Sequence, residues 1–304
     1  MADLEVEAVN AATYTADAEA IPGANALILK AQILLDRAGA SPGVIDSYYG
    51  ENVAKAIAAV ETVLELPVDG RLDPQVWAAL GGDNAPAVLV QYTITEDDTA
   101  GPFVPDIPTD YSEQAQLDRL AYTGPQEMFS ERFHMDVDLL AALNPDVDFN
   151  QPGSSIVVAA TDGPPIVSPI VRIDVDKTLK QLRAYDGESR LVVAYPASIG
   201  SDENPSPSGT HAVDAIAQEP FYNYDPENFV QGNNNMKLTL PPGPNNPVGI
   251  VWIGLTERGY GIHGTPAPSR IDKTGSHGCI RITNWDAEEL AARLQPGVVV
   301  TFLE

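Results

Sequence analysis

The apolar residues of this 304-residue chain change their period part-way along the sequence, and that change constrains the fold most. Near the N-terminus they recur at helical spacing, over residues 27–34 and again over 53–63. Beyond residue 165 they alternate as in strands, over 171–175 and 191–195. A chain of this length can hold two or three separate cores. We therefore predict a multidomain α+β protein.

The N-terminal part predicts a small three-helix domain over residues 22–85. Two helices cover residues 25–39 and 52–64, and Asp73-Pro74 caps a short third one. Residues 1–21 are rich in Ala, Asp and Glu without an apolar period, so they are predicted to be a disordered lead-in.

Residues 22–85 resemble the peptidoglycan-binding domain found at the ends of many wall enzymes. The resemblance rests on Gly-x-Ile-Asp-x-x-Tyr-Gly and on Leu-Pro-Val-Asp-Gly-x-Leu-Asp-x-x-x-Trp. Ser47 departs from it, because a glycine is usual at that position. The alternative is a helical bundle that only packs against its neighbour.

Residues 86–165 predict a connector followed by a small module. A strand fits residues 88–94, two helices fit residues 128–133 and 137–143, and a second strand fits 156–159. This order, with Asn-Pro and Pro-Gly in the second half, resembles a LysM module. A plain α/β linker domain is the alternative.

Asp-Gly-Pro-Pro at 162–165 marks a boundary, and residues 166–304 predict a mostly-β domain, a sandwich or barrel. Further strands fit residues 249–255 and 298–303, and one helix fits 284–294. Residues 221–247 combine aromatic residues with Asn, Pro and Gly. A long segment of this kind before the last strands suggests a lid over a cleft.

Charge excludes two classes of partner. Acidic residues outnumber basic ones 43 to 17, giving a formal charge of −26, so nucleic acid and anionic lipid would be repelled. We interpret the acidity itself as an adaptation to solubility or salt. No apolar stretch of about 18 residues predicts a membrane span. The N-terminus lacks a secretory signal, so the chain is cytoplasmic or begins after a removed leader.

The chemistry of the chain gathers around its only cysteine, Cys279, which excludes an intrachain disulfide and a Cys-rich zinc site. Two of the four histidines, His263 and His277, lie within 16 residues of it. A thiol attacks as a thiolate, so it needs a base or a positive partner that lowers its pKa. Either histidine could serve. The alternative is a free cysteine buried in a core strand, although its neighbours are Gly, Ser and His.

Tyr260-Gly-Ile-His-Gly-Thr-Pro, Ser269-Arg-Ile and Ser276-His-Gly-Cys-Ile-Arg-Ile together resemble the signature of the L,D-transpeptidases of the YkuD type. The resemblance covers residues 168–304. Asp272 departs from it, because a glycine is common in that turn.

The resemblance implies a mechanism in which Cys279 attacks a peptidoglycan stem peptide, releases D-alanine and forms a thioester. His263 would be the general base, with its ring held by the Gly264 carbonyl. Backbone N–H groups of His277, Gly278 and Cys279 would form the oxyanion hole. The implied substrate-binding residues are Ser276, Arg281, Tyr260 and Thr265. Ser276 would also orient the loop, and Arg281 would pair with a substrate carboxylate or, alternatively, with Asp286. No metal or cofactor is implied.

Several outcomes of the thioester stay open. The acyl acceptor can be a second stem peptide, an envelope protein or water, and water would make the protein a carboxypeptidase. A wall-binding protein with an inactive catalytic domain is a further alternative, and a zinc hydrolase is disfavoured because no glutamate lies near. Stem peptides lie outside the cytoplasmic membrane, so we expect the bacterial periplasm or wall, with a leader removed. Carbapenems, which offer a strained amide, are expected to acylate Cys279.

Overall fold

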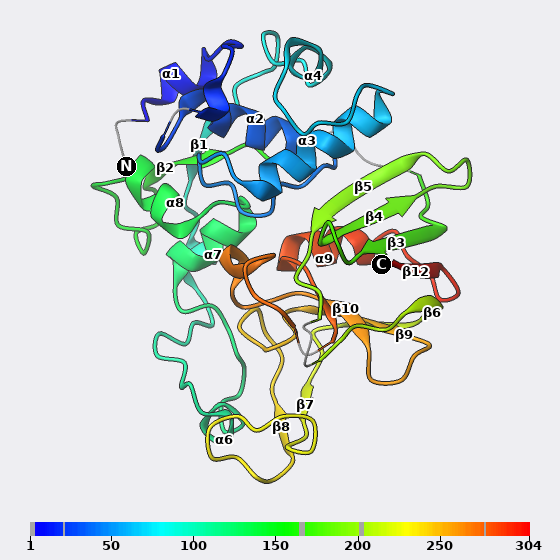
Figure 1. Ribbon diagram of the computed structural model, residues 1–304. Helices are drawn as coiled ribbons and strands as arrows, with labels where there is room; N and C mark the ends of the chain where they lie inside the picture. Colours follow the sequence, from blue (N-terminus) through cyan, green and yellow to red (C-terminus); the bar gives the residue numbers. More distant parts are fainter. Residues whose placement is uncertain (1–3, 21, 164–167, 201–203, 277) are drawn as a thin grey trace.

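The computed structural model describes residues 4–20, 22–163, 168–200, 204–276 and 278–304. Figure 1 shows three regions. Helices α1–α4, α7 and α8 surround the small sheet β1–β2 in the upper part, and the large C-terminal sheet lies below and to the right. A lobe with α6, β7 and β8 projects at the bottom. Each region has a hydrophobic cluster of its own.

The three helices predicted at the N-terminus are confirmed as α2 (Ala26–Arg37), α3 (Glu51–Val63) and α4 (Pro74–Ala79). Asn25 caps α2 by accepting from the N–H groups of Leu27 and Ile28, and Asp73 caps α4 in the same way. Ser47 has a φ of +71°, a left-handed conformation that explains why a glycine is usual there.

The prediction of a disordered lead-in is wrong for residues 4–20. They include α1 (Val6–Asn10) and a 3-10 turn, Ala18–Ala20. Val9 is fully buried, and the Asn10 side chain accepts from Val88 N at 2.8 Å and Leu89 N at 2.9 Å. Val9 and Asn10 thus hold this segment against the rest of the protein. Because two residues suffice for this contact, the segment is ordered without a periodic pattern of apolar residues.

The middle of the chain contains the two predicted strands and the two predicted helices, together with two short helices that were not predicted. Strand β1 (Leu89–Thr93) pairs antiparallel with β2 (Ser155–Ala159). The helices between them are α5 (Glu96–Thr99), α6 (Tyr111–Gln114), α7 (Pro125–Arg132) and α8 (Val137–Leu143). Side chains from this module share one hydrophobic core with α2 and α3. The LysM-like nature of the module stays a prediction, as do the domain boundaries.

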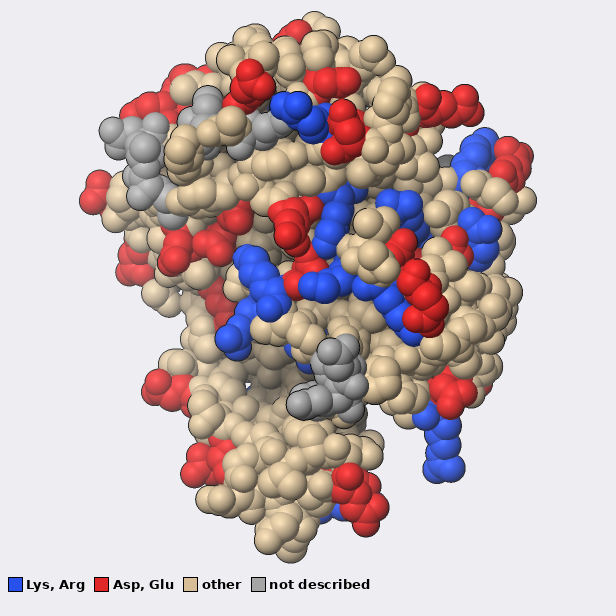
Figure 2. All heavy atoms as spheres, viewed as in Figure 1, with Lys and Arg blue, Asp and Glu red and all other residues tan. Residues whose placement is uncertain are grey.

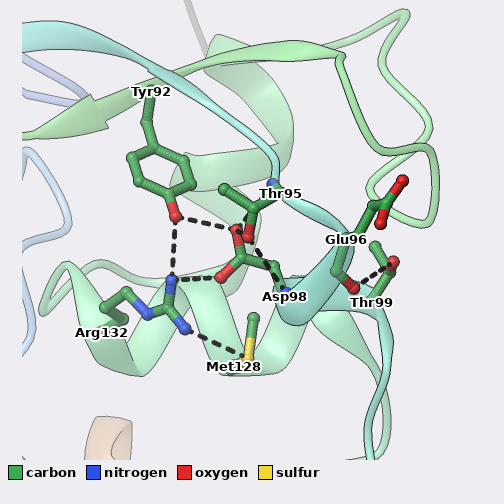
Figure 3. Close-up of polar contacts among 7 residues, drawn as sticks. All are labelled: Tyr92, Thr95, Glu96, Asp98, Thr99, Met128 and Arg132. Carbon is green, nitrogen blue, oxygen red and sulfur yellow. Dashed lines mark hydrogen bonds and ion pairs between the residues drawn. The ribbon is translucent and has the colours of Figure 1, made fainter.

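Helix α7 is fixed to the rest of the module by a polar network around Asp98, shown in Figure 3. The Asp98 carboxylate accepts from Arg132 Nη1 at 2.6 Å and from the Tyr92 hydroxyl at 2.8 Å. Burial would raise the pKa of Asp98, but hydrogen bonds from Thr95, Arg132 and Tyr92 lower it to about 2. The ion pair is therefore present at neutral pH.

The C-terminal domain is mostly β, as predicted, and is built on one curled eight-stranded sheet in the order β11-β10-β9-β6-β12-β3-β4-β5. Its strands are β3 (Arg172–Asp176), β4 (Gln181–Tyr185), β5 (Leu191–Pro196), β6 (Gly209–Gln218), β9 (Val251–Leu255), β10 (Gly261–His263), β11 (Ile280–Arg281) and β12 (Val299–Leu303). Helix α9 (Asn284–Ala291) packs Ala287, Leu290 and Ala291 into the core inside the curl. Ser198, just after β5, exchanges backbone hydrogen bonds with Arg281 on β11. The two ends of the sheet therefore meet, as in a barrel.

The lobe brings together two segments that are far apart in the sequence. Strands β7 (Tyr222–Tyr224) and β8 (Leu238–Leu240) form a hairpin, and α6 packs beside it. Leu120, Tyr224 and Leu240 form its core. Gln231 Nε2 donates to Thr109 O at 2.7 Å, and Asn245 N donates to Leu120 O at 3.0 Å. Residues 86–120, expected to be mainly connector, thus supply half of the lobe.

The N-terminal region is docked on the C-terminal sheet. Ser41 N donates to Ala194 O, and Ala194 N donates to Gly39 O, each at 2.9 Å, so residues 39–41 extend the sheet beside β5. Lys55 on α3 pairs with Asp272 at 2.5 Å. His134 of the middle module stacks on Trp285 of α9, with ring centroids 5.0 Å apart. Polar contacts thus dominate the seam.

Asp286 is buried in this seam and predicts how stability depends on pH. Ser41 Oγ donates to it at 3.2 Å, while burial, with Asp36 and Glu289 nearby, raises the pKa of its carboxyl to about 8. The folded state therefore holds a proton that the unfolded chain loses near pH 4. Stability from this proton is complete below pH 4 and is lost as the pH rises toward 8, by about 1.4 kcal/mol per pH unit.

Asp286→Asn is expected to remove this slope and to stabilise the protein at pH 7–8. Urea unfolding of the wild type and the variant at pH 5, 6, 7 and 8 measures the difference. If the free energies of unfolding of the wild type and the variant changed in parallel with pH across this range, the raised pKa of Asp286 would be contradicted. Asp174→Asn serves as the control, because Asp174 lies outside the seam on β3.

No helix in the described ranges is long and apolar enough to cross a bilayer. On the face shown in Figure 2, acidic side chains are spread over most of the surface and the basic ones gather near the middle. Lys55 and Lys180, which both pair with Asp272, belong to the seam between the N-terminal region and the sheet. Lys55, on α3, thus binds the N-terminal region to the C-terminal domain, whereas Lys180 pairs with Asp272 within that domain.

Candidate active site

The site is built on β10 and β11, which run parallel. His263 is the register partner of Arg281, and Ile262 is the partner of Ile280. Register partners point to the same face of a sheet, so His263 and Arg281 share one face, and Cys279 lies directly before β11. Ile262, Ile280 and Ile282 point to the other face and are buried in the core. The isoleucines thus fix the face to which the His263 imidazole and the Arg281 side chain point.

Trp252 of β9 completes the support beneath His263. The two are register partners, and their rings stack with centroids 5.6 Å apart and an interplanar angle of 18°. A Cβ at Gly261 would lie 2.6 Å from the Trp252 ring, so only a glycine lets the indole lie across β10. The imidazole is therefore held from one side by an aromatic ring.

His263 is in the neutral form. Its Nδ1 lies 2.6 Å from Gly264 O, so Nδ1 carries the proton and Nε2 keeps its lone pair. The predicted contact with the Gly264 carbonyl is confirmed. The side chain is 4% exposed, and burial together with the charge of Arg281 lowers the pKa of His263 to about 3. The lone pair is available at every pH above about 4.

Cys279 is half-buried, and its Sγ lies 3.8 Å from Gly259 O. Burial raises the pKa of the thiol, although the Gly261 backbone and the charge of Arg281 act in the opposite direction. The expectation of a lowered pKa is therefore wrong for the resting protein, because desolvation outweighs the positive partner. The pair at rest is a neutral thiol and a neutral imidazole.

Arg281 lies on the same face, and its charge acts on Cys279, Tyr111 and Tyr222. Its Nε is buried without a hydrogen-bond partner, and within the described ranges no ion pair joins it to Asp286. The Asp286 N–H instead donates to Oγ1 of Thr283, the N-cap of α9, and the Asp286 carboxyl binds Ser41. The alternative of a structural Arg281–Asp286 pair is thus wrong.

The loop before Cys279 is held by hydrogen bonds of Ser276. Its Oγ donates to Cys279 O and accepts from Gly278 N at 3.1 Å, and its side chain is buried. Gly278 has a φ of +104°, and a Cβ there would lie 2.8 Å from the Tyr260 ring. Because the Gly278 N–H binds Ser276, it is not free to serve an oxyanion in this conformation. His277 lies outside the described residues.

The remaining predicted residues surround this loop. The Tyr260 ring packs against Gly278 and is half-buried. Thr265 is 2% exposed, its N–H donates to Asn284 Oδ1 at 3.0 Å, and its hydroxyl accepts from Ala267 N. The hydrogen bonds of Thr265 and Ser276 therefore shape the turns around the site. This structural role does not depend on contact with a substrate.

Two residues that border the site were not predicted as site residues, although Tyr222 lies in the 221–247 segment predicted to be a lid. Tyr111 comes from α6 and Tyr222 from β7, and their rings meet edge to face at 6.0 Å. The charge of Arg281 acts on both, which places them at the site from the lobe. A cavity of about 300 Å³ adjoins the site loop on the N-terminal side, between Tyr48 and Lys273, and does not include Cys279. Within the described ranges no group of His, Cys, Asp or Glu side chains is arranged to hold a metal ion.

Known proteins resemble this chain in sequence. The L,D-transpeptidase catalytic domain family, YkuD, matches residues 170–301. The putative L,D-transpeptidase YkuD of Bacillus licheniformis is 31% identical over 177 residues, covering 58% of this chain and 91% of its own. The chain belongs to the YkuD family of L,D-transpeptidases. The probable L,D-transpeptidase YbiS of Escherichia coli is 26% identical over 189 residues, covering 60% of this chain and 61% of its own.

The peptidoglycan-binding domain family matches residues 25–80 and therefore α2, α3 and α4. The N-terminal resemblance is thus confirmed, while neither match reaches the middle module. Among solved structures, the L,D-transpeptidase from Mycobacterium smegmatis is 20% identical and covers 50% of this chain and 64% of its own. Its TM-score is 0.35, so no detail of this YkuD-family enzyme is inferred from it.

Proposed function

We propose that this L,D-transpeptidase acts on peptidoglycan stem peptides through a thioester on Cys279. The parallel register of β10 and β11 supports the proposal, because it pairs the neutral His263 with Arg281, two residues after Cys279. A nucleophile beside a base that is itself oriented by a third group is the arrangement that acyl transfer requires. Here the third group is the Gly264 carbonyl.

The first step breaks the amide between the diamino acid at position three and the following D-alanine. Cys279 Sγ bonds to the carbonyl carbon while His263 Nε2 takes the thiol proton. The same proton then passes to the leaving nitrogen, and D-alanine departs. Because the resting thiol is neutral, proton transfer and attack occur together. The Cys279 N–H is the proposed backbone donor to the oxyanion.

Arg281 is the proposed partner of a substrate carboxylate. Its buried, unpaired Nε and its place beside Tyr111 and Tyr222 suit an anion entering from the lobe side. A fork of guanidinium donors can bind a carboxylate through two parallel hydrogen bonds. The lobe thus acts as the proposed lid. Thr265, Ser276 and Tyr260 would shape the pocket, with Gly278 giving the loop its turn.

The thioester is then resolved by an acceptor amine. The amine nitrogen bonds to the thioester carbon and His263 takes its extra proton. The C–S bond then breaks, and the proton passes from His263 to the sulfur, which restores the thiol. We propose a second stem peptide or an envelope protein as acceptor, in the periplasm or the wall. Water as acceptor would give carboxypeptidase activity, and the ratio of cross-linked to trimmed product from purified muropeptides measures the choice.

Intact-protein mass spectrometry after incubation with a carbapenem tests the nucleophile. The strained amide of the drug offers the same chemistry as the stem peptide, and we expect one adduct, mapped by peptide digestion to Cys279. An adduct on another residue, or folded protein without an adduct, would remove the basis of the proposed thioester and favour a wall-binding role.

A further inference from the structure

Asn284, the first residue of α9, lies directly behind the proposed base. It is 1% exposed, and its Oδ1 accepts from Thr265 N at 3.0 Å. The Thr265 N–H and the Gly264 carbonyl belong to one planar peptide group, so they point in opposite directions. Asn284 therefore binds one end of the peptide group whose other end holds His263 Nδ1.

The fit around Asn284 is close. A Cβ at Gly264 would lie 2.1 Å from Asn284 Oδ1, and one at Gly249 would lie 2.0 Å from the same atom. Two glycines thus form a slot for the amide oxygen. Any shift of Asn284 must move the 264–265 peptide group, and with it the acceptor of His263.

The chain of hydrogen bonds continues into the middle module. Asn284 Nδ2 donates to Glu131 Oε2 at 2.9 Å and to Pro244 O at 3.2 Å. Glu131 lies on α7, is 5% exposed, and is fixed in place because the adjacent Arg132 pairs with Asp98 (Figure 3). The helix that carries Glu131 belongs to the module before the catalytic domain.

We propose that Asn284 and Glu131 are positioning residues for His263, and that the middle module thereby aligns the base of the catalytic domain. The path runs from the Glu131 carboxyl through the Asn284 amide and the 264–265 peptide to Nδ1–H. Each amide in such a chain polarises the next and becomes a better acceptor. This inference rests on the proposed role of His263.

The test compares variants by their rate constants for acylation by a carbapenem. Glu131→Met keeps the length of the side chain but removes the acceptor, and we expect the acylation step at saturating drug to slow about tenfold. Drug binding should change little, because Glu131 and Asn284 are both buried. Glu131→Gln, which keeps an acceptor oxygen, should retain most of the wild-type rate.

Glu127→Met is the matched control. Glu127 lies one turn earlier on α7 and also bonds across the domains, from Asn245 Nδ2 at 3.0 Å, but that path does not lead to His263. Its acylation rate should stay near that of the wild type. Alkylation of Cys279 by iodoacetamide, which needs no aligned base, should be equal in all variants.

The effect of Glu131→Met in a variant that lacks the base distinguishes a positioning role from a general loss of stability. In a His263→Asn background, Glu131→Met should slow acylation no further, because the base it aligns is gone. Should Glu131→Met not fold, Asn284→Asp replaces it, because it keeps the acceptor for Thr265 and loses the donor to Glu131; we expect a similar tenfold loss.

Equal acylation rates for Glu131→Met, or its replacement Asn284→Asp, and for Glu127→Met would overturn the inference. A full tenfold loss that persists in the His263→Asn background would overturn it as well. Both results differ from a failure of the proposed function, in which the wild type itself would form no adduct at Cys279.

Discussion

Cys279→Ala is expected to lower D-alanine release from a tetrapeptide substrate to the background, a loss of at least about 10⁴-fold. A methyl group forms no acyl bond, and no second cysteine exists in the chain to replace it. Release of D-alanine, followed by chromatography of the reaction products, measures the change. The melting temperature should change little, because the thiol lies at the edge of the core and is half-buried.

Cys279→Ser is the matched variant for the same residue. It keeps a nucleophilic atom and nearly the same volume, yet the hydroxyl is a far weaker acid than a thiol. His263, whose pKa is about 3, is too weak a base to activate it. We therefore expect the serine variant to be about as inactive as the alanine variant. Substantial turnover by the serine variant would mean that a stronger base than His263 serves the site.

His263→Asn is expected to slow acylation of Cys279 by about 10²–10⁴-fold at pH 7. Asparagine can still donate a hydrogen bond from the position of Nδ1 to Gly264 O, but it provides nothing in place of Nε2. The change thus removes the base while it keeps the local hydrogen bond. The rate of carbapenem adduct formation under single-turnover conditions measures the loss.

The pH profile gives the same prediction a second readout. The pKa of His263 is lowered to about 3, so the base is already neutral throughout pH 5–8 and the wild-type acylation rate should be flat over that range. The His263→Asn variant must form its thiolate without help. Because the pKa of the thiol is raised, its rate should climb about tenfold per pH unit across the same range. A wild-type rate that falls below pH 6.5 would show that His263 titrates as an exposed histidine.

Much of this enzyme was predictable from local sequence signals. The caps at Asn25 and Asp73 locate two helices, and the alternation of residues 171–175 and 191–195 locates β3 and β5. The Ser-His-Gly-Cys motif locates the site, because short motifs keep their neighbours close in space. Local signals of this kind depend on a few adjacent residues, so a single sequence contains them in full.

Contacts between distant segments were not predictable. The pairing of residues 101–123 with the β7–β8 hairpin depends on single side chains such as Gln231 and Asn245, which carry no pattern. Strand β6 was missed because its burial does not alternate over its ten residues. The raised pKa of Cys279 also escaped prediction, because desolvation is set by the complete fold around the thiol. Glu131, 153 positions from Asn284, lies beyond the range of any motif.

The way the sheet ends limits how a peptide can reach the thiol. At Ala194 the outer side of β5 is already taken by residues 39–41, and at Arg281 the outer side of β11 is taken by Ser198. Many proteins capture an extended peptide by adding it as another strand at such an edge. Here those backbone groups are occupied, so a stem peptide has to be recognised by side chains as it crosses the face of the sheet. Selectivity would then depend on the branching and charge of the peptide, with little contribution from its main chain.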